Sequence, residues 1–407
     1  MKCITLAYGA DDPLVLELGD GALVAQCRSP EGLGGEAARH AVAAALAAPA
    51  EGPPLGGHVV PGDRVTIALS GGVPQASEVV AAITEALASA GVRRDDMSLL
   101  QAPPLEMATG GGRPVPLAPP VGIGDTAAFE PAIESQTSYI AADAAGRPIH
   151  VARALVDADV VVSVGRWGWD AAFGGRGLDG ELWPAFSRRA CRQDLLRMLA
   201  ARGRRGLRGW RAGCQEAAWQ LGLCASLRIV GGRADTLLAA AFGMPAAAAR
   251  RARTLADGWR PLVAGMAEVT IASLSDPRGT PAMLLRAVAA AARVTHPTGT
   301  ICVASRLAET PGVIFARWRE GAPLEPLVRE ALGTGDAALI ADAFLTRFFA
   351  RALGDRRLVL LSELSETTVE ELELGFAASP EVVERLAHRS KRVVVLEEAD
   401  RMLPRLR

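Results

Sequence analysis

The residues best suited to chemistry lie close together in the middle of the chain. Two tryptophans, two arginines and an aspartate fall within eleven consecutive positions around a Gly-Gly pair: Arg166, Trp167, Trp169, Asp170, Gly174, Gly175 and Arg176. An indole face stacks on flat groups, while a guanidinium binds a carboxylate through two parallel hydrogen bonds. Because only 4% of the chain is aromatic, the cluster predicts a binding site for a small carboxylate-bearing substrate, with Asp170 as a candidate catalytic residue. The alternative is that the tryptophans only fill space.

A second candidate site follows an apolar segment at 64–69. Ser70, Gly71 and Gly72 come directly after this segment and precede a stretch with helical spacing, 77–91, which ends at a glycine. The backbone N–H groups at the start of a helix suit an anion. The alternative interpretation is a tight turn that needs glycine for its backbone.

Metal ligands are sparse, and we predict no metal site. Asp170, Asp179 and Glu181 are carboxylates near the cluster, and carboxylate oxygens are preferred by hard cations. Magnesium therefore stays a secondary hypothesis. The six cysteines contain no C-x-x-C pair, so neither a zinc ribbon nor a disulfide framework is expected.

The segments that must position these residues alternate between strand-like and helical patterns. Strands are expected at 64–69, 97–100, 156–164, 268–274, 299–304, 357–361 and 392–396, and later helices at 281–294 and 380–389, with Ser379 as the N-cap of the last one. Such alternation is typical of parallel sheets with a site at the carboxyl ends of the strands. We predict two α/β domains, 1–262 and 263–407, with mostly parallel sheets and an active-site cleft between them.

Composition limits the partners that this protein can have. The chain has 407 residues, half of them hydrophobic, and a formal net charge of −1, which provides material for two cores and no overall attraction to nucleic acid or membrane. One arginine-rich run, 188–211, is either a phosphate-binding or partner-docking segment or a solvated helix face with a loop. Acidic residues near the start, and the lack of an apolar run of roughly 18 residues, disfavour secretion and membrane insertion. We expect a cytoplasmic protein.

Several motifs of the chain resemble the nickel-dependent lactate racemase family. Within 146–177 the matching residues are Gly146, Pro148, Val151, Arg153, Ala158, Asp159, Val160, Gly174 and Gly175. Further matches at 6–9, 52–55, 214–245 and 285–303 extend the resemblance over most of the chain. It implies a lactate racemase-like α/β fold and isomerase chemistry on a small carboxylate-bearing molecule.

The resemblance also implies a cofactor, which the residues of this chain do not accommodate. Family members carry a nickel pincer nucleotide tethered to a lysine, with histidines as metal ligand and acid/base pair. Matching the motifs puts Gly177 at that lysine and Trp167 at one catalytic histidine. The chain has only Lys2 and Lys391, both near its ends, and no histidine between Val151 and His296. We therefore expect no nickel pincer nucleotide and predict no cofactor.

Two further positions correspond to functional residues of the family. Glu106 falls where the family has a catalytic histidine, and a carboxylate acts as a general base when burial raises its pKa. A solvated loop glutamate is the alternative. Arg286 falls at the family's second lysine, near the amino end of a helix, and keeps the positive charge with a different geometry. At 70–75 the carboxylate and guanidinium of the family's first substrate-binding turn are both missing.

Two hypotheses about function follow. The first is an enzyme that has lost the nickel cofactor and uses acid/base chemistry for isomerisation, epimerisation, cyclisation or elimination, with Glu106 as the base and Arg166, Arg176 or Arg286 as the carboxylate clamp. The second is a catalytically inactive racemase scaffold that serves as a binding or regulatory protein. A cleft with convergent polar groups favours the enzyme, and a cleft filled with apolar side chains favours the second hypothesis.

Overall fold

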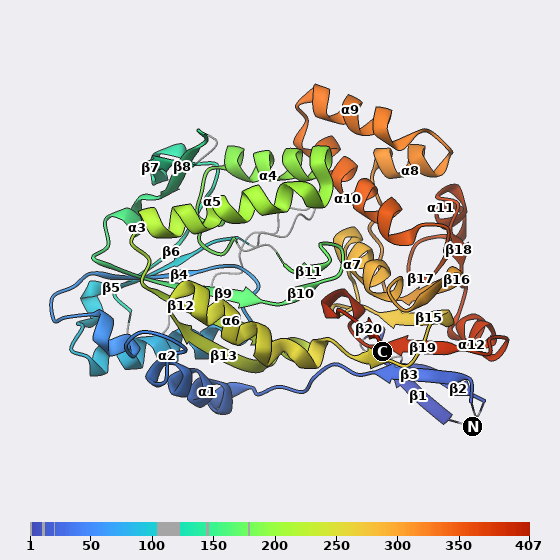
Figure 1. Ribbon diagram of the computed structural model, residues 1–407, viewed down its shortest axis with the longest axis horizontal. Coiled ribbons are helices and arrows are strands. Elements are labelled where there is room, and N and C mark those ends of the chain that lie inside the picture. The colour runs from blue at the N-terminus through green and yellow to red at the C-terminus, as the bar shows by residue number, and fades with distance from the viewer. Residues whose placement is uncertain (1, 10–12, 20, 104–122, 144–145, 178–179) are drawn as a thin grey trace.

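Two six-stranded sheets lie beside each other in the computed structural model, which describes residues 2–9, 13–19, 21–103, 123–143, 146–177 and 180–407 (Figure 1). The first sheet has the strand order β13-β12-β9-β4-β5-β6. Its strands are parallel except for the antiparallel pair β12–β13. Their bounds are β4 Val65–Leu69, β5 Met97–Gln101, β6 Asp125–Ala128, β9 Val160–Trp167, β12 Ala225–Gly231 and β13 Leu237–Gly243.

The second sheet is parallel throughout, in the order β18-β17-β16-β15-β19-β3. Its strands are β3 Leu23–Cys27, β15 Ala267–Ser273, β16 Thr295–Ala304, β17 Arg357–Leu361, β18 Gly375–Phe376 and β19 Val393–Leu396. Strand β3 belongs to the predicted first range, 1–262, yet it completes the sheet of the second range. Its partner β19 is so distant in the chain that local sequence patterns carry no sign of the pairing.

Helices and a hairpin cover both faces of the sheets (Figure 1). In the first sheet, α1 (Gly35–Ala47) and α2 (Ala76–Ser89) pack on Val65, Ile67 and Leu69 of β4, while Ala68 faces the opposite apolar cluster. In the second, the alternation along β15 sends Val269 toward the hairpin β1–β2 (Lys2–Leu6 and Leu14–Leu18) and α12 (Pro380–His388). The other face of β15 is covered by α7 (Pro281–Ala291).

The remaining long helices pack on the first unit or on one another. They are α4 (Arg189–Arg202), α5 (Leu207–Gln220), α6 (Pro245–Leu255), α9 (Leu324–Thr334) and α10 (Ala337–Leu353), accompanied by the shorter α8 (Val313–Arg319) and α11 (Glu366–Glu371). Helix α4 packs against α10, which joins the first unit to the second. None of the described helices combines the length and the apolar character needed to cross a bilayer.

Most predicted strands are confirmed to within a few residues, and the clearest difference lies before β9. The segment predicted as a strand at 156–164 starts with the end of a short helix, α3 (Arg153–Val156), and the strand begins at Val160. Here Asp159 accepts a hydrogen bond from the Arg64 backbone N–H at 2.9 Å, which holds a turn before the strand. Ser379 is the N-cap of α12 as predicted, but its side chain does not cap the helix.

Candidate functional site

In each sheet the strands are added first on one side of a starting strand and then on the other, which creates a switch point. Two predicted groups, the turn at Ser70 and the residue Arg166, lie at the switch point of the first sheet. In the first sheet the switch point falls between β4 and β9, and in the second between β15 and β19. Ligands of open α/β sheets bind outside the carboxyl ends of the strands at such points. Ser70 follows β4 and donates its backbone N–H to the Val164 carbonyl of β9 at 2.9 Å, while Arg166 lies near the end of β9. The glycine turn continues at Gly72, whose φ of +76° favours glycine.

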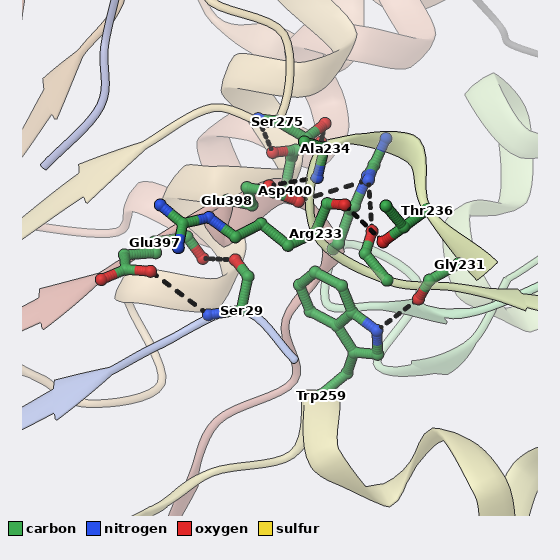
Figure 2. Close-up of polar contacts among 12 residues, drawn as sticks. Ser29, Gly231, Arg233, Ala234, Thr236, Trp259, Ser275, Glu397, Glu398 and Asp400 are labelled. Atoms are coloured by element: carbon green, nitrogen blue, oxygen red, sulfur yellow. Dashed lines mark hydrogen bonds and ion pairs between the residues drawn. The ribbon is translucent and has the colours of Figure 1, made fainter. Parts of the chain in front are cut away.

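The carboxyl ends of the two sheets meet at a polar joint that local sequence patterns did not predict (Figure 2). After β12, the Ala234 N–H donates to Glu398 Oε1 at 3.0 Å. On the second sheet, the Ser275 N–H and hydroxyl donate to the two Asp400 carboxylate oxygens at 2.7 and 2.6 Å. Ala234 and Glu398 both have positive φ, +49° and +47°, a conformation that costs free energy in non-glycine residues. The joint therefore holds strained backbone between the two sheets.

Burial at the joint raises the pKa of Glu398, and hydrogen bonding from Ala234 together with the charge of Arg401 partly opposes this rise. Arg401 contacts Glu398 Oε2 at 3.2 Å and donates to the Gly232 carbonyl of the first unit at 3.3 Å. The joint is thus held by a buried carboxylate whose charge is costly.

The predicted cluster forms a small hairpin that bridges the two units. Strands β10 (Trp169–Asp170) and β11 (Gly175–Arg176) pair antiparallel. Asp170 accepts a hydrogen bond from the Phe173 N–H at 3.1 Å through one oxygen and forms an ion pair with Arg286 of α7 at 3.0 Å through the other. The Asp170 side chain is 7% exposed and the Arg286 side chain 21%. The structure thus brings these two predicted residues together, and they form an ion pair with each other.

Both tryptophans of the cluster are buried. Trp167 and Trp169 are 4% and 7% exposed and pack edge to face, with ring centroids 5.0 Å apart. The Trp169 indole N–H donates to the Ala256 carbonyl at 2.9 Å, and the Arg260 guanidinium lies 4.5 Å from its ring centroid. The surfaces predicted to stack on a flat substrate are therefore in contact with the protein.

The Gly-Gly turn is shaped by an arginine from the arginine-rich run. Arg204 donates to the carbonyls of Ala171 and Ala172 at 2.9 and 2.8 Å. Gly174 has a φ of +74°, and a Cβ atom added to it would lie 2.7 Å from an Arg204 nitrogen. A side chain at Gly174 would therefore push away the guanidinium that holds the turn.

Two cavities meet at Arg204. One, which we name the hairpin cavity, has a volume of about 430 Å³ and is lined by Phe173, Arg176, Arg204, Leu207, Arg208, Arg211, Ala212 and Gln215. The other, which we name the interdomain cavity, has a volume of about 630 Å³ and is lined by residues 201–205 together with Leu324, Glu325, Arg347, Phe348 and Arg351. The arginine-rich run thus lines both cavities, so it is not only a solvated helix face.

The sequence patterns did not predict a role for the arginines of α10. Arg347 and Arg351 stand four residues apart in a helix that is otherwise largely apolar, so they share one face of it. That spacing was a usable signal, but only the packing of α10 against α4 shows where the face points.

The structure does not bring the remaining predicted residues together in one site. Glu181 forms a buried ion pair with Arg228, apart from the pair of Asp170. Glu106 and Asp179 lie outside the described residues, so the proposed base and the magnesium hypothesis stay predictions. Among the described residues there is no group of three or more His, Cys, Asp or Glu side chains arranged to hold a metal ion.

The arrangement of two open α/β sheets joined at their carboxyl ends is shared with known structures. The chain is similar to the lactate racemase apoprotein from Thermoanaerobacterium thermosaccharolyticum, with a TM-score of 0.74 and 16% identity, covering 99% of this chain and 100% of that one. It is also similar to a protein from Thermotoga maritima, with a TM-score of 0.60 and 11% identity over 93% and 100% of the two chains. No protein-family model matches the sequence, and no curated protein does. The predicted lactate racemase-like α/β fold is confirmed.

Proposed function

We propose that this chain is a racemase-like scaffold that binds a small carboxylate-bearing molecule in the hairpin cavity without abstracting a proton from it. The observation that carries this proposal is the chemistry of the cavity lining. Four arginines, Arg176, Arg204, Arg208 and Arg211, surround a space of about 430 Å³, which is within the usual size of small-molecule sites.

The lining suits a short organic anion. Guanidinium groups stay protonated at all ordinary pH values and bind carboxylates through paired hydrogen bonds. Phe173 and Leu207 supply apolar surface for a carbon skeleton. Arg176, a predicted substrate-binding residue, lies in this lining, so the proposal keeps the predicted class of ligand.

The lining does not suit proton abstraction. Within the described part of the chain, no aspartate, glutamate, histidine, cysteine, lysine or tyrosine lines the hairpin cavity, and general base catalysis needs such a group within hydrogen-bonding reach. Asp170, the other predicted catalytic residue, already accepts hydrogen bonds through both oxygens. This favours the binding hypothesis over the acid/base enzyme, whose base would be Glu106.

We further propose that the chain does not use a nickel pincer nucleotide, because its residues do not fit one. Gly177, at the position of the tethering lysine, has no amine, and Trp167 is buried where the family has a histidine. Lys391 is exposed and precedes β19, so it lies at the amino end of a parallel strand, away from the edge where the sheets meet. Lys2 is exposed at the start of the hairpin β1–β2.

The test uses L-lactate, L-malate and succinate as probes, with calorimetry for binding and proton NMR in D₂O for exchange at the carbon next to the carboxylate. We expect at least one probe to bind and none to exchange. Arg208→Gln should weaken binding by about tenfold, the effect of one charge-assisted hydrogen bond, while Arg251→Gln, on the exposed surface of α6, should not. Exchange that requires the protein would favour the acid/base enzyme, and no binding of any probe would contradict the proposal.

A further inference from the structure

The interdomain cavity holds more positive charge than its own carboxylate balances. Its lining contains five arginines, Arg202, Arg204, Arg205, Arg347 and Arg351, and one acidic residue, Glu325. Five positive charges and one negative charge leave an excess of four. The chain as a whole has a net charge of −1, so this concentration is a local property of the cavity.

Most of these guanidiniums are not used to hold the fold together. Arg347 pairs with Glu325 at 2.8 Å, and Arg204 is engaged with the carbonyls of the hairpin. The side chains of Arg202, Arg205 and Arg351 make no hydrogen bond or ion pair within the described part of the chain. Three donor groups therefore face a concave space without a structural role.

Two arginines of this lining, Arg204 and Arg351, are close enough to repel each other. The pKa of Arg204 is lowered, first by its burial and next by the charge of Arg351, while Asp170 partly opposes the effect. Like charges at close range destabilise the unliganded protein. An anion in the cavity would relieve that repulsion.

The size of the charge excess indicates the ligand. A phosphate ester carries about −1.5 to −2 at pH 7, and two linked phosphates, which share a bridging oxygen, carry roughly −3, which offsets most of the excess of four in the cavity. A single carboxylate would leave most of it uncompensated. Guanidinium groups also match the geometry of phosphate oxygens through paired hydrogen bonds.

We propose that the interdomain cavity binds a small molecule with two linked phosphate groups, either inorganic pyrophosphate or the diphosphate of a nucleotide. Arg202 and Arg205 would bind it from the end of α4 and the turn that follows, and Arg351 from α10. The diphosphate would then bridge the first unit and the second. This proposal does not rest on carboxylate binding in the hairpin cavity, since the two sites share only Arg204.

The test measures binding of sodium pyrophosphate, ADP and orthophosphate by calorimetry, without Mg²⁺ and at constant ionic strength. We expect pyrophosphate or ADP to bind at least about tenfold more tightly than orthophosphate. The Arg202→Gln/Arg351→Gln variant should lose at least about tenfold in affinity for the diphosphate. Tighter binding of ADP than of pyrophosphate would support a nucleotide ligand, and equal or weaker binding would support the inorganic anion.

Three variants control the result. The pair Arg251→Gln/Arg389→Gln removes two positive charges from exposed positions outside the cavity and should leave the affinity within about twofold of the unmodified protein. Arg208→Gln should also leave it unchanged, which separates this site from the hairpin cavity. The variant Arg202→Lys/Arg351→Lys keeps both positive charges but lacks the paired donors of the guanidinium. Its affinity should lie between that of the unmodified protein and that of Arg202→Gln/Arg351→Gln. Diphosphate binding no tighter than that of orthophosphate, or an unchanged affinity in the Arg202→Gln/Arg351→Gln variant, would overturn the proposal.

Discussion

The Asp170–Arg286 pair and the arginines of the interdomain cavity are both near Arg204, but the charges are paired in the first group and largely unpaired in the second. Both oxygens of Asp170 are occupied, one by a backbone N–H and one by Arg286, and the pair is mostly buried. In the cavity, Arg202 and Arg351 are exposed and have no acidic partner among the described residues. Buried charges need partners to keep the protein folded, whereas unpaired charges in a cavity are available to a ligand.

Most of the predicted cluster is therefore used inside the protein, and of its charged residues Arg176 lines the hairpin cavity. Asp170 and Trp169, which were predicted to act on or bind a substrate, instead contact other parts of the protein and so hold the hairpin in place. Apart from Arg176, the arginines that line the two cavities come from the arginine-rich run and from α10. Removing Asp170 should therefore lower stability, whereas removing an unpaired arginine from the interdomain cavity should raise it.

The largest effect should follow from Asp170→Ala. This variant removes the carboxylate that pairs with the partly buried Arg286 and the acceptor of the Phe173 N–H, and removal of one member of a buried pair costs about 3 kcal/mol or more. Urea unfolding measures the loss. The matched control is Glu325→Ala, whose pair with Arg347 is 66% exposed on the glutamate side and should contribute less than about 1 kcal/mol. Equal losses of unfolding free energy in the two variants would contradict the view that the Asp170 pair is structural while the charges of the cavity are not.

A smaller effect is expected at the joint and depends on pH. Burial raises the pKa of Glu398, so the folded protein keeps this proton at pH values where the unfolded chain has released it. The stability that Glu398 contributes is thus fully present below the ordinary glutamate pKa and is lost as the pH rises through the raised value. Glu398→Gln should flatten the pH dependence of the unfolding free energy in that window, while Glu370→Gln, at an exposed position, should not. An unchanged slope in Glu398→Gln would show that the carboxylate is not buried in solution.

The smallest effect should have the opposite sign. Arg351→Gln removes one repelling charge from the cavity and should raise the unfolding free energy of the unliganded protein by about 0.5 kcal/mol at low salt, with the gain shrinking as salt screens the charges. Chemical denaturation at two salt concentrations measures this. Arg389→Gln, outside the cavity, should give no such gain. A clear loss of stability in Arg351→Gln would mean that this arginine has a structural role.

Local sequence patterns were sufficient for most of the framework. The apolar run that becomes β4 and the segment that becomes β17 are continuous and bounded by polar residues, so the predicted strands at 64–69 and 357–361 lie within one residue of those observed. Strand β3 could not be placed in the same way, because its pairing with β19 joins the two ends of the chain. Short strands carry little information about which partner they will find.

The candidate site was predictable in composition but not in arrangement. The spacing of Arg166, Trp167, Trp169, Asp170 and Arg176 marked an unusual segment, yet nothing in that spacing distinguishes a tryptophan that faces a ligand from one that packs inside. The environment of Trp169 depends on Ala256 and Arg260, which come from a distant part of the chain. The joint at Glu398 carried no local signal at all.

Residue type and periodicity along the chain are enough to establish the class of fold, the strand–helix alternation, the absence of an internal lysine and the abundance of arginine between residues 188 and 211. The pairing of Asp170 with Arg286, and the position of Arg202 and Arg351 on one cavity, follow only from the packing of the folded chain. Whether a charge is paired or left open to a ligand is set by distances between atoms from different elements, and those distances exist only once the two sheets have been joined.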